Sequence, residues 1–311
     1  REQRGGGDKA PVDALLDRRK DLQADGDRTG LDRVGDDQRP QEVVPVIGDG
    51  DQAVGDVGRL GDRDEHALLI VEGYREVKRA LDNQIPILKL FYCPELYQGE
   101  NEPALVAGCA EKGAQLIECT PPVFRKIAYR DRPEGLLALC PQIRRTLADL
   151  RLPPRPFIVV AEHIEKPGNL GTMLRTADAA GADALIVCDR CTDIHNPNVV
   201  RASIGTLFTV PVAEASTDDT IAWLRARGIR SVAASPHATK NYTDVDMTRP
   251  VAIVVGAEQY GLSSAWMTQA DDLVRIPMLG QADSLNVAAA ATILLYEVVR
   301  QRGKPAPNQA G

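Results

Sequence analysis

Residues 161–180 combine side chains and spacing that suit a phosphate-binding unit. Their sequence, AEHIEKPGNLGTMLRTADAA, follows the apolar run Phe157–Val160, which predicts a buried strand. Pro167-Gly168 predicts a turn, and Asn169 is a suitable N-cap for the helix that follows. Arg175 lies in that helix, outside its apolar stripe. An arginine near a helix N-terminus favours phosphate binding, although many α/β proteins contain such a unit.

Two later blocks also follow predicted strands. One runs from Gly256 to Leu262 (GAEQYGL), and the other runs from Ile276 to Ala288 (IPMLGQADSLNVA) into an alanine-rich helix. The four alanines at 288–291 allow close approach of a ligand or backbone, but they equally suit simple helix propensity. Ligands of open α/β sheets bind at the carboxyl ends of the strands. We therefore expect the three blocks to meet at one edge of a sheet.

Strands and helices alternate along two stretches, which predicts two α/β domains. The first covers residues 63–145, with strands at 67–72, 88–92, 115–118 and 135–140 and helices at 73–81, 103–112 and 122–127. Residues 146–156 contain the proline-rich LRLPPRP and predict a linker. The second covers residues 157–304, with strands at 157–160, 184–187, 207–212, 231–234, 251–255 and 273–276 and helices at 170–180, 199–206, 217–227, 263–269 and 284–302. For this second domain we expect a parallel sheet with helices on both faces. Residues 305–311 remain as a tail.

Residues 1–62 differ in composition from the rest of the chain. They contain no aromatic residue and hold 10 basic and 15 acidic side chains. Such a segment buries too little apolar surface to offset its ordering entropy, so we predict an acidic disordered segment. The net charge of the whole chain is −7, and residues 1–62 account for −5 of it. The near-neutral remainder is compatible with local basic patches that contact RNA.

The bulk composition favours a cytoplasmic protein without a metal. The 311 residues are 43% hydrophobic and contain no apolar run long enough to cross a bilayer, so no membrane partner is expected. The six cysteines form no framework pattern, which indicates reduced thiols. Cys188, Cys191 and His195 have spacing that suggests zinc, but structural zinc needs four ligands.

A basic cluster precedes the last predicted strand of the first domain. Its members are Arg125, Lys126, Arg130 and Arg132. Two interpretations are equally weighted: a solvated charged face, or a surface that contacts RNA phosphates.

Taken together, the three blocks resemble the SpoU/TrmH family of SPOUT-class RNA ribose 2′-O-methyltransferases. The matching patterns are Asn169-Leu-Gly-x-x-x-Arg175, Gly256-Ala-Glu258-x-x-Gly261-Leu262, and Ile276-Pro-Met278 followed by Ser284-Leu-Asn-Val-Ala288. The similarity also includes Val71-Glu-Gly73 and Glu134-Gly-Leu-Leu-Ala138 of the first domain. Any one pattern alone would be weak, but their order and spacing make a chance match improbable.

The resemblance implies a fold and a cofactor. The fold is an α/β SPOUT domain with a deep C-terminal trefoil knot, preceded by a small L30e-like domain that binds RNA. The cofactor is S-adenosylmethionine, contacted at Gly256, Ile276 and Leu285, with Met278 and Ala288 close by. The resemblance also implies a homodimer whose active site lies at the subunit interface.

The resemblance also implies roles for the polar residues. Family proposals give Arg175 the role of base, but a guanidinium is normally a fixed cation. A more conservative role is that Arg175 grips a phosphate and stabilises the developing alkoxide. Asn169 and either Ser284 or Asn286 would orient the ribose, and Glu258 would orient Arg175. The plainer alternatives are an N-cap for Asn169 and a surface carboxylate for Glu258.

The sequence therefore predicts an enzyme that methylates a ribose 2′-hydroxyl in structured RNA. Large-subunit (23S) rRNA is the first expectation, because the first domain resembles that of rRNA-modifying relatives. A tRNA substrate is the alternative within the same chemistry. The alternative from another class is a knotted RNA-binding module without catalytic turnover.

Overall fold

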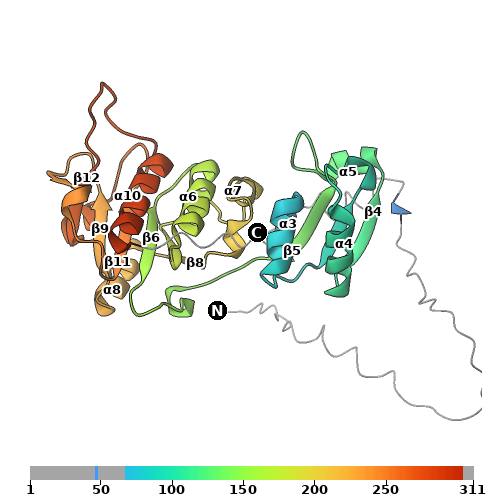
Figure 1. Cartoon of the computed structure of the whole chain (residues 1–311), viewed down its shortest axis with the longest axis horizontal. Coiled ribbons are helices and arrows are strands. Elements are labelled where there is room, and N and C mark those ends of the chain that lie inside the picture. The colour runs from blue at the N-terminus through green and yellow to red at the C-terminus, as the bar shows by residue number, and fades with distance from the viewer. Residues whose placement is uncertain (1–45, 48–66, 304–311) are drawn as a thin grey trace, which may run out of the picture. The chain divides into compact units, whose positions relative to one another are not determined.

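The computed structural model of this chain describes residues 46–47 and 67–303 (Figure 1). Two sheets organise these residues, one in the N-terminal region (residues 46–47 and 67–141) and one in the C-terminal region (residues 157–303). Among the described residues, no helix has the length and apolar character that a bilayer crossing requires.

The N-terminal region contains a five-stranded mixed sheet of order β1-β4-β3-β5-β2. Its strands are β1 (Val46–Ile47), β2 (Leu68–Glu72), β3 (Lys89–Tyr92), β4 (Gln115–Cys119) and β5 (Leu136–Pro141). Its helices are α3 (Tyr74–Asp82), α4 (Glu102–Glu111) and α5 (Pro121–Ile127), with a 3-10 turn η4 (Pro94–Leu96). Strands β3 and β4 are parallel, whereas β5 runs antiparallel to β2 and β3.

The predicted disorder of residues 1–62 is wrong at residues 46–47. This pair forms β1, which runs parallel to β4 at the edge of the sheet. Unpaired backbone groups of an edge strand can accept a short extra strand whatever the composition of the surrounding segment. The other residues of that segment lie outside the part of the chain that the structure describes.

The C-terminal region contains a seven-stranded sheet of order β10-β12-β9-β11-β6-β7-β8, and every pair in it is parallel, as predicted. Its strands are β6 (Phe157–Glu162), β7 (Ala184–Cys188), β8 (Val212–Ala215), β9 (Arg230–Ala234), β10 (Lys240–Asn241), β11 (Val251–Val255) and β12 (Asp272–Arg275). Its helices are α6 (Pro167–Ala180), α7 (Pro197–Ala202), α8 (Thr217–Ala226), α9 (Ser264–Gln269) and α10 (Val287–Arg302). The 3-10 turns are η5 (Leu147–Asp149), which precedes the sheet, η6 (Thr206–Phe208) and η7 (Tyr242–Asp244).

Helices cover both faces of this sheet because the strands are apolar on both faces. Along β6, Phe157 and Val159 pack in one hydrophobic cluster with α6 and α10. The alternate residues Ile158 and Val160 pack in another with α8 and α9. This period of two is the pattern expected of a strand buried on both sides. The predicted two-sided arrangement is therefore confirmed.

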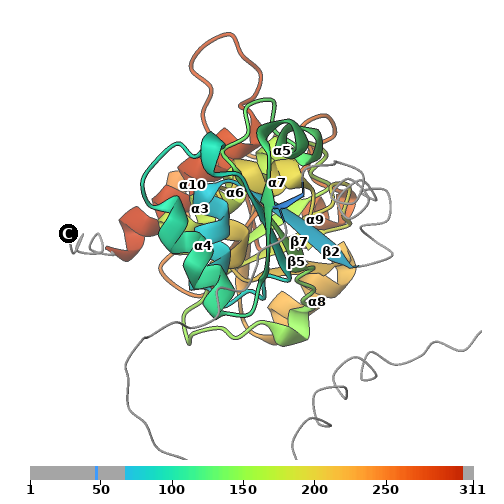
Figure 2. The same ribbon diagram turned by 90° about the vertical axis from the view of Figure 1, so that its right-hand side faces the viewer.

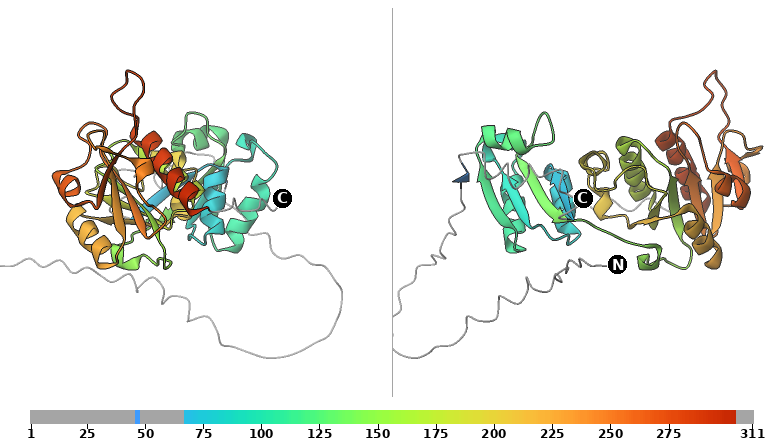
Figure 3. Two further views of the ribbon diagram at one scale, coloured as in Figure 1. Left: turned by 60° about the vertical axis from the view of Figure 1, so that its left-hand side comes forward. Right: turned by 180° about the vertical axis from the view of Figure 1, so that it is seen from behind.

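Two predicted elements of this region differ most from the structure, and the helix predicted at 199–206 is also shifted, to Pro197–Ala202. The strand predicted at 207–212 is wrong: η6 occupies its first part, after Gly205 turns the chain at φ 76°, and β8 begins only at Val212. A short apolar run indicates burial but does not distinguish a strand from a turn of helix. The last helix was predicted from residue 284 but begins at Val287, so residues 276–286 form a loop that projects beyond the strands (Figures 1, 2 and 3).

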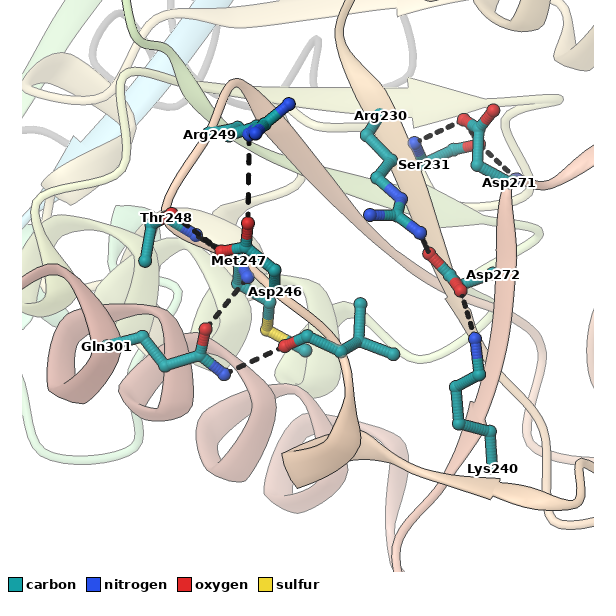
Figure 4. Close-up of polar contacts among 11 residues, drawn as sticks. Arg230, Ser231, Lys240, Asp246, Met247, Thr248, Arg249, Asp271, Asp272 and Gln301 are labelled. Carbon is teal, nitrogen blue, oxygen red and sulfur yellow. Dashed lines mark hydrogen bonds and ion pairs between the residues drawn. The ribbon is translucent and has the colours of Figure 1, made fainter.

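The end of α10 is held by polar contacts to the loop before β11 (Figure 4). Gln301 donates to the Val245 carbonyl (2.9 Å) and accepts from the Met247 N–H (2.8 Å). The Arg302 guanidinium donates to the carbonyls of Pro156 (3.0 Å) and Arg249. The last turn of α10 is thereby fixed to the amino-terminal edge of the sheet.

A buried ion cluster ties together the outer strands of the sheet. The side chain of Asp272 is 2% exposed and lies 2.6 Å from both Arg230 Nη2 and Lys240 Nζ. Figure 4 shows this carboxylate between the two cations, which come from β9 and β10. Because a buried charge is costly unless it is paired, the cluster favours the observed order of β9, β12 and β10.

Candidate active site

The carboxyl ends of β6, β11 and β12 bring the three sequence blocks to one edge of the sheet. These strands share one direction, so the residues that follow them lie on the same side. Contacts among side chains confirm that the blocks meet: Glu258 contacts Asn169 of the first block and Asn286 of the third.

Glu258 is the centre of a polar cluster. Its Oε1 accepts hydrogen bonds from Asn169 Nδ2 and from Asn286 Nδ2, the latter at 2.9 Å. Its Oε2 accepts from the ammonium group of Lys166. The side chain is 28% exposed, so the carboxylate is in reach of a ligand from solvent. We call Glu258, Lys166, Asn169 and Asn286 the Glu258 cluster.

Asn169 does not cap α6, contrary to the N-cap interpretation. The helix begins at Pro167, and Lys166 occupies the N-cap position without a side-chain hydrogen bond. Proline suits the first helical position because its φ is preset and its missing N–H would have no partner there. Asn169 therefore lies inside the first turn, where its amide donates to Glu258 and its Oδ1 accepts from Asn286 (3.2 Å).

Asn286 combines a structural and a polar role. It is the N-cap of α10, and its Oδ1 accepts from the backbone N–H groups of Ala288 (3.0 Å) and Ala289 (3.3 Å). With the oxygen held by the helix, the Nδ2 group can only point away from it, toward Glu258 and Asn169. The helix N-terminus thus fixes the orientation of the amide.

Arg175 and Ser284 are not drawn into this cluster. Both are exposed, and in the described part of the chain neither forms a hydrogen bond or ion pair with Glu258. Glu258 instead orients the two asparagines and Lys166. The guanidinium of Arg175, on α6, therefore keeps its five donors for a ligand.

The block after β11 is a tight turn that only glycine permits at its first position. A Cβ at Gly256 would lie 2.4 Å from the Gly261 carbonyl oxygen. The turn closes through a hydrogen bond from the Gly261 N–H to the Ala257 carbonyl (2.9 Å), with Gly261 at φ 69°. This close approach leaves backbone groups at the carboxyl edge of the sheet, which is where a ligand would bind.

The predicted cofactor-binding residues come after strands that end at this edge, in the loop 276–286, or in the first turn of α10. Gly256 and Ile276 directly follow β11 and β12, whereas Ala288 is buried in the first turn of α10. Met278 and Leu285 lie in the loop 276–286, and Leu285 is 38% exposed. Apolar side chains beside a glycine turn fit a ligand such as S-adenosylmethionine, which presents an adenine ring and an aliphatic chain.

The charges of the cluster stabilise each other. The hydrogen bond from Lys166 is the main cause that lowers the pKa of Glu258 below its usual 4.5, and the one from Asn169 adds to it. The same contact raises the pKa of Lys166. Glu258 therefore stays an anion at neutral pH, where it holds its partners rather than taking up a proton.

Sequence reasoning missed Lys166. Its signal was its position immediately before Pro167 in the first block, next to the turn. The side chain is 69% exposed, and the residue that it pairs with lies 92 positions away in the sequence. No local pattern identifies that partner.

In the N-terminal region, the four predicted RNA-contacting cations differ from one another. Arg125, Lys126 and Arg132 are exposed. Arg130 is only 14% exposed in its side chain and donates to Glu76 (2.7 Å) and Glu134 (2.6 Å). The structure thus leaves Arg130 largely covered and ion-paired, whereas the other three are exposed.

The residues with zinc-like spacing have other surroundings. Cys188 is buried with its Sγ 3.2 Å from the hydroxyl of Thr220, whereas Cys191 is exposed. His195 is buried, and its Nε2 lies 2.9 Å from the Ile143 carbonyl oxygen.

Comparisons with known proteins place this site in a family. Residues 156–296 match the SpoU rRNA Methylase family, and residues 59–138 match the MRM3-like substrate binding domain. The chain is 33% identical to the 23S rRNA (uridine(2479)-2′-O)-methyltransferase of Streptomyces viridochromogenes, over 79% of this chain and 87% of that protein. It is 31% identical to the 23S rRNA (guanosine(2553)-2′-O)-methyltransferase RlmP of Bacillus subtilis (strain 168), over 60% of this chain and 74% of that one. The crystal structure of an AdoMet-bound rRNA methyltransferase from Sinorhizobium meliloti has a TM-score of 0.73 and 35% identity, covering 80% of this chain and 95% of that chain. The chain therefore belongs to the SpoU rRNA methylase family.

Proposed function

We propose that this protein transfers a methyl group from S-adenosylmethionine to a ribose 2′-hydroxyl of large-subunit (23S) rRNA. The observation that carries the proposal is the Glu258 cluster, assembled from all three sequence blocks at the carboxyl edge of a parallel sheet. The named activities of the relatives support the same substrate class.

The cluster and Arg175 provide what this reaction needs from the protein. S-adenosylmethionine, when bound, supplies an electrophilic methyl group. The 2′-oxygen must lose its proton and lie in line with that methyl group, and fixed polar groups contribute to both. Arg175, with free donors, would hold a neighbouring phosphate and stabilise negative charge as it develops on the 2′-oxygen. The amides of Asn169 and Asn286 are already oriented by Glu258 and can position the ribose.

The catalytic and cofactor-binding residues are proposed as follows. Arg175 stabilises charge, Glu258 orients the cluster, and the ribose is positioned by amide or hydroxyl groups that include Ser284. The cofactor surface consists of Gly256, Ile276, Met278, Leu285 and Ala288. No metal takes part in this scheme.

A homodimer and a trefoil knot are part of the proposal. Leu279 is 97% exposed, Tyr260 77% and Tyr296 48%, which is unusual for such large apolar side chains and suits contact with a second copy. For the knot, β12 lies beyond β9, whereas α10 packs on α6 and β11. The loop 276–286 must therefore cross back over neighbouring strands before α10 begins, as a threaded chain would.

The N-terminal region is proposed as an L30e-like RNA-binding domain at residues 63–145, joined by a linker to a methyltransferase domain at 157–304, in a cytoplasmic protein. Arg125, Lys126 and Arg132 are exposed and suited to phosphate contact. Arg132 also lines a cleft of about 910 Å³ together with Arg75 and Arg130. Arg130 lines the same cleft but is paired with Glu76 and Glu134, so it would contribute less to phosphate contact.

The test uses methyl-labelled S-adenosylmethionine with unmodified 23S rRNA and, separately, with unmodified tRNA. We expect label on the rRNA at a linkage that resists alkali, because a methylated 2′-oxygen cannot attack the adjacent phosphate. Label on tRNA alone would contradict the proposed rRNA substrate but would support ribose 2′-O-methylation. A folded protein that binds the cofactor and labels neither RNA would contradict the proposed activity.

A further inference from the structure

Glu162 is a fully buried carboxylate at the end of β6 that does not belong to the Glu258 cluster. Its side chain has no exposed surface. Buried acidic side chains are rare unless their oxygens are satisfied, so this residue has a role to explain. It is the last residue of β6, at the carboxyl edge of the sheet where the three sequence blocks follow their strands.

Both oxygens of Glu162 accept hydrogen bonds from distant parts of the chain. Oε1 accepts from the hydroxyl of Thr217 (2.7 Å), the first residue of α8. Oε2 accepts from the backbone N–H of Ser263 (2.8 Å), which is 101 positions away in the sequence. The carboxylate thus joins three elements that meet only in the folded protein.

The bond to Ser263 fixes one end of the glycine turn. The turn 256–262 leaves the sheet at the end of β11, where strand pairing holds it. It ends at Ser263, the N-cap of α9, which lacks a side-chain cap bond. Glu162 therefore anchors the end of the turn that the sheet does not hold, and Glu258 lies within that turn.

A metal site is a weaker explanation for this carboxylate. Ligand atoms of Glu162, His163 and Asp189 lie within 4.8 Å of one another. However, the two Glu162 oxygens already face an N–H and an O–H donor. Asp189 likewise accepts from the Thr217 N–H (3.2 Å). These contacts describe a hydrogen-bonded junction at the start of α8.

We infer that Glu162 is a positioning residue for cofactor binding: its carboxylate holds the Ser263 N–H and so sets the turn that carries Gly256 and Glu258. This role requires a side chain long enough for its oxygen to accept from the Ser263 N–H, and it does not require a negative charge. The inference rests on the proposed function, in which this turn binds S-adenosylmethionine.

Two conservative variants of Glu162 distinguish the effect of side-chain length from the effect of negative charge. Glu162→Asp keeps the negative charge but shortens the side chain by one methylene, so its oxygen no longer reaches Ser263. Glu162→Gln keeps the length, and its amide oxygen still accepts from the Ser263 N–H while its amino group donates to the Thr217 hydroxyl. Loss of a hydrogen bond to a charged group predicts a dissociation constant for S-adenosylmethionine that rises roughly tenfold to a hundredfold in Glu162→Asp. For Glu162→Gln we expect a value within about threefold of the wild type.

Glu102 provides a matched control. It is also a buried glutamate, 3% exposed, and it accepts from two backbone N–H groups, those of Gln98 (3.1 Å) and Gly99 (2.9 Å). It belongs to the N-terminal region, so Glu102→Asp should loosen a local turn without changing cofactor affinity. Equal weakening in both Asp variants would indicate general destabilisation and overturn the assignment.

Calorimetric titration of the full-length variants with S-adenosylmethionine, with circular dichroism as the check on folding, decides the matter. Unchanged affinity in a folded Glu162→Asp, or weakening in Glu162→Gln as large as in Glu162→Asp, would overturn the inference. If Glu162→Asp does not fold, Thr217→Val tests it instead, because it removes one of the two donors that hold the carboxylate. We expect Thr217→Val to bind S-adenosylmethionine a few-fold more weakly. An unchanged affinity in this variant would overturn the inference. Because binding is measured without RNA, a wild type that binds the cofactor but methylates no RNA would contradict the proposed function alone.

Discussion

Arg130 in the N-terminal region and Arg175 in the C-terminal region show two opposite uses of arginine. The Arg130 guanidinium donates to the side chains of Glu76 and Glu134 and to the Glu72 carbonyl (2.9 Å). Arg175 is exposed and forms no hydrogen bond or ion pair with the described residues. An arginine whose donors are bonded inside the protein stabilises the fold, whereas one with free donors is available to a ligand.

The glutamates of the two regions differ in the same way. Burial raises the pKa values of Glu72 and Glu76, and it outweighs the nearby Arg130 charge. The hydrogen bond from Lys166 instead lowers the pKa of the more exposed Glu258. Desolvation therefore disfavours the charged forms of Glu72 and Glu76, whereas Glu258 at the proposed site is stabilised as an anion.

The largest expected effect comes from removing the buried arginine. Arg130→Ala leaves Glu72 and Glu76 buried without their cation, and breaking such a pair costs about 3–5 kcal/mol of unfolding free energy. Urea unfolding measures this loss. The exposed neighbour serves as control, because Arg132→Ala should change stability by less than about 0.5 kcal/mol. Equal losses of unfolding free energy in the two variants would contradict a structural role for Arg130 that Arg132 lacks.

Arg175→Ala should behave in the opposite manner. We expect methyl transfer to fall by a factor of about 100–1000, as for loss of a group that stabilises transition-state charge. Stability and cofactor affinity should not change, since no internal contact is lost. Arg249→Ala is the control, because that side chain is 82% exposed and precedes β11 at the opposite edge of the sheet. Turnover that survives in Arg175→Ala would contradict the role proposed for Arg175, whereas a wild type that binds RNA without turnover would support a binding module.

Asn286 tests whether the amide orientation matters apart from the helix cap. Asn286→Asp keeps a good N-cap for α10 but places a carboxylate against Glu258. We expect activity to fall by about tenfold, since like charges at this distance repel by about 1 kcal/mol or more. The helix cap is kept, so any loss of thermal stability should come from this repulsion and not from the cap. Asn286→Ala, in contrast, should cost about 1 kcal/mol of stability through the lost cap.

The smallest effect is an opposite response of the two regions to acid. Glu72 and Glu76 have raised pKa values, so their contribution to stability is full below pH 4.5 and is lost as the pH rises through their folded pKa values. Glu258 has a lowered pKa, so its contribution is present above pH 4.5 and is lost as the pH falls through its folded value. Hydrogen exchange, resolved by region across a pH series, measures both. Glu76→Gln should flatten the response of the N-terminal region only.

Much of the fold follows from local sequence. The strand predicted at 251–255 has the observed bounds, because five consecutive apolar residues suit a strand buried on both faces. Element types and order were predictable wherever such periodicity was sustained. The apolar run at 207–212 could not be assigned to a strand or to a helical turn from the sequence, because both would bury the same side chains.

The candidate site was predictable in its members but not in its contacts. Asn169 was expected to cap α6 or to orient the ribose, yet its amide is bound to Glu258, 89 positions away. With proline at 167 the helix starts three residues earlier than predicted, which leaves that amide for another partner. Lys166 was missed for the same reason: contacts between distant segments are set by strand order, which periodicity does not determine.

The order of the strands also determines when the site can first exist during synthesis. Asn286, which bonds to Asn169, follows it 117 residues later in the chain. At typical elongation rates of roughly 5–20 residues per second, that interval lasts roughly 6–23 s. The sheet cannot present a complete cluster before α10 has been made and its last turn has docked on Val245 and Met247. A nascent chain would therefore carry an incomplete site until α10 has been made, and activity would begin only once that helix is in place.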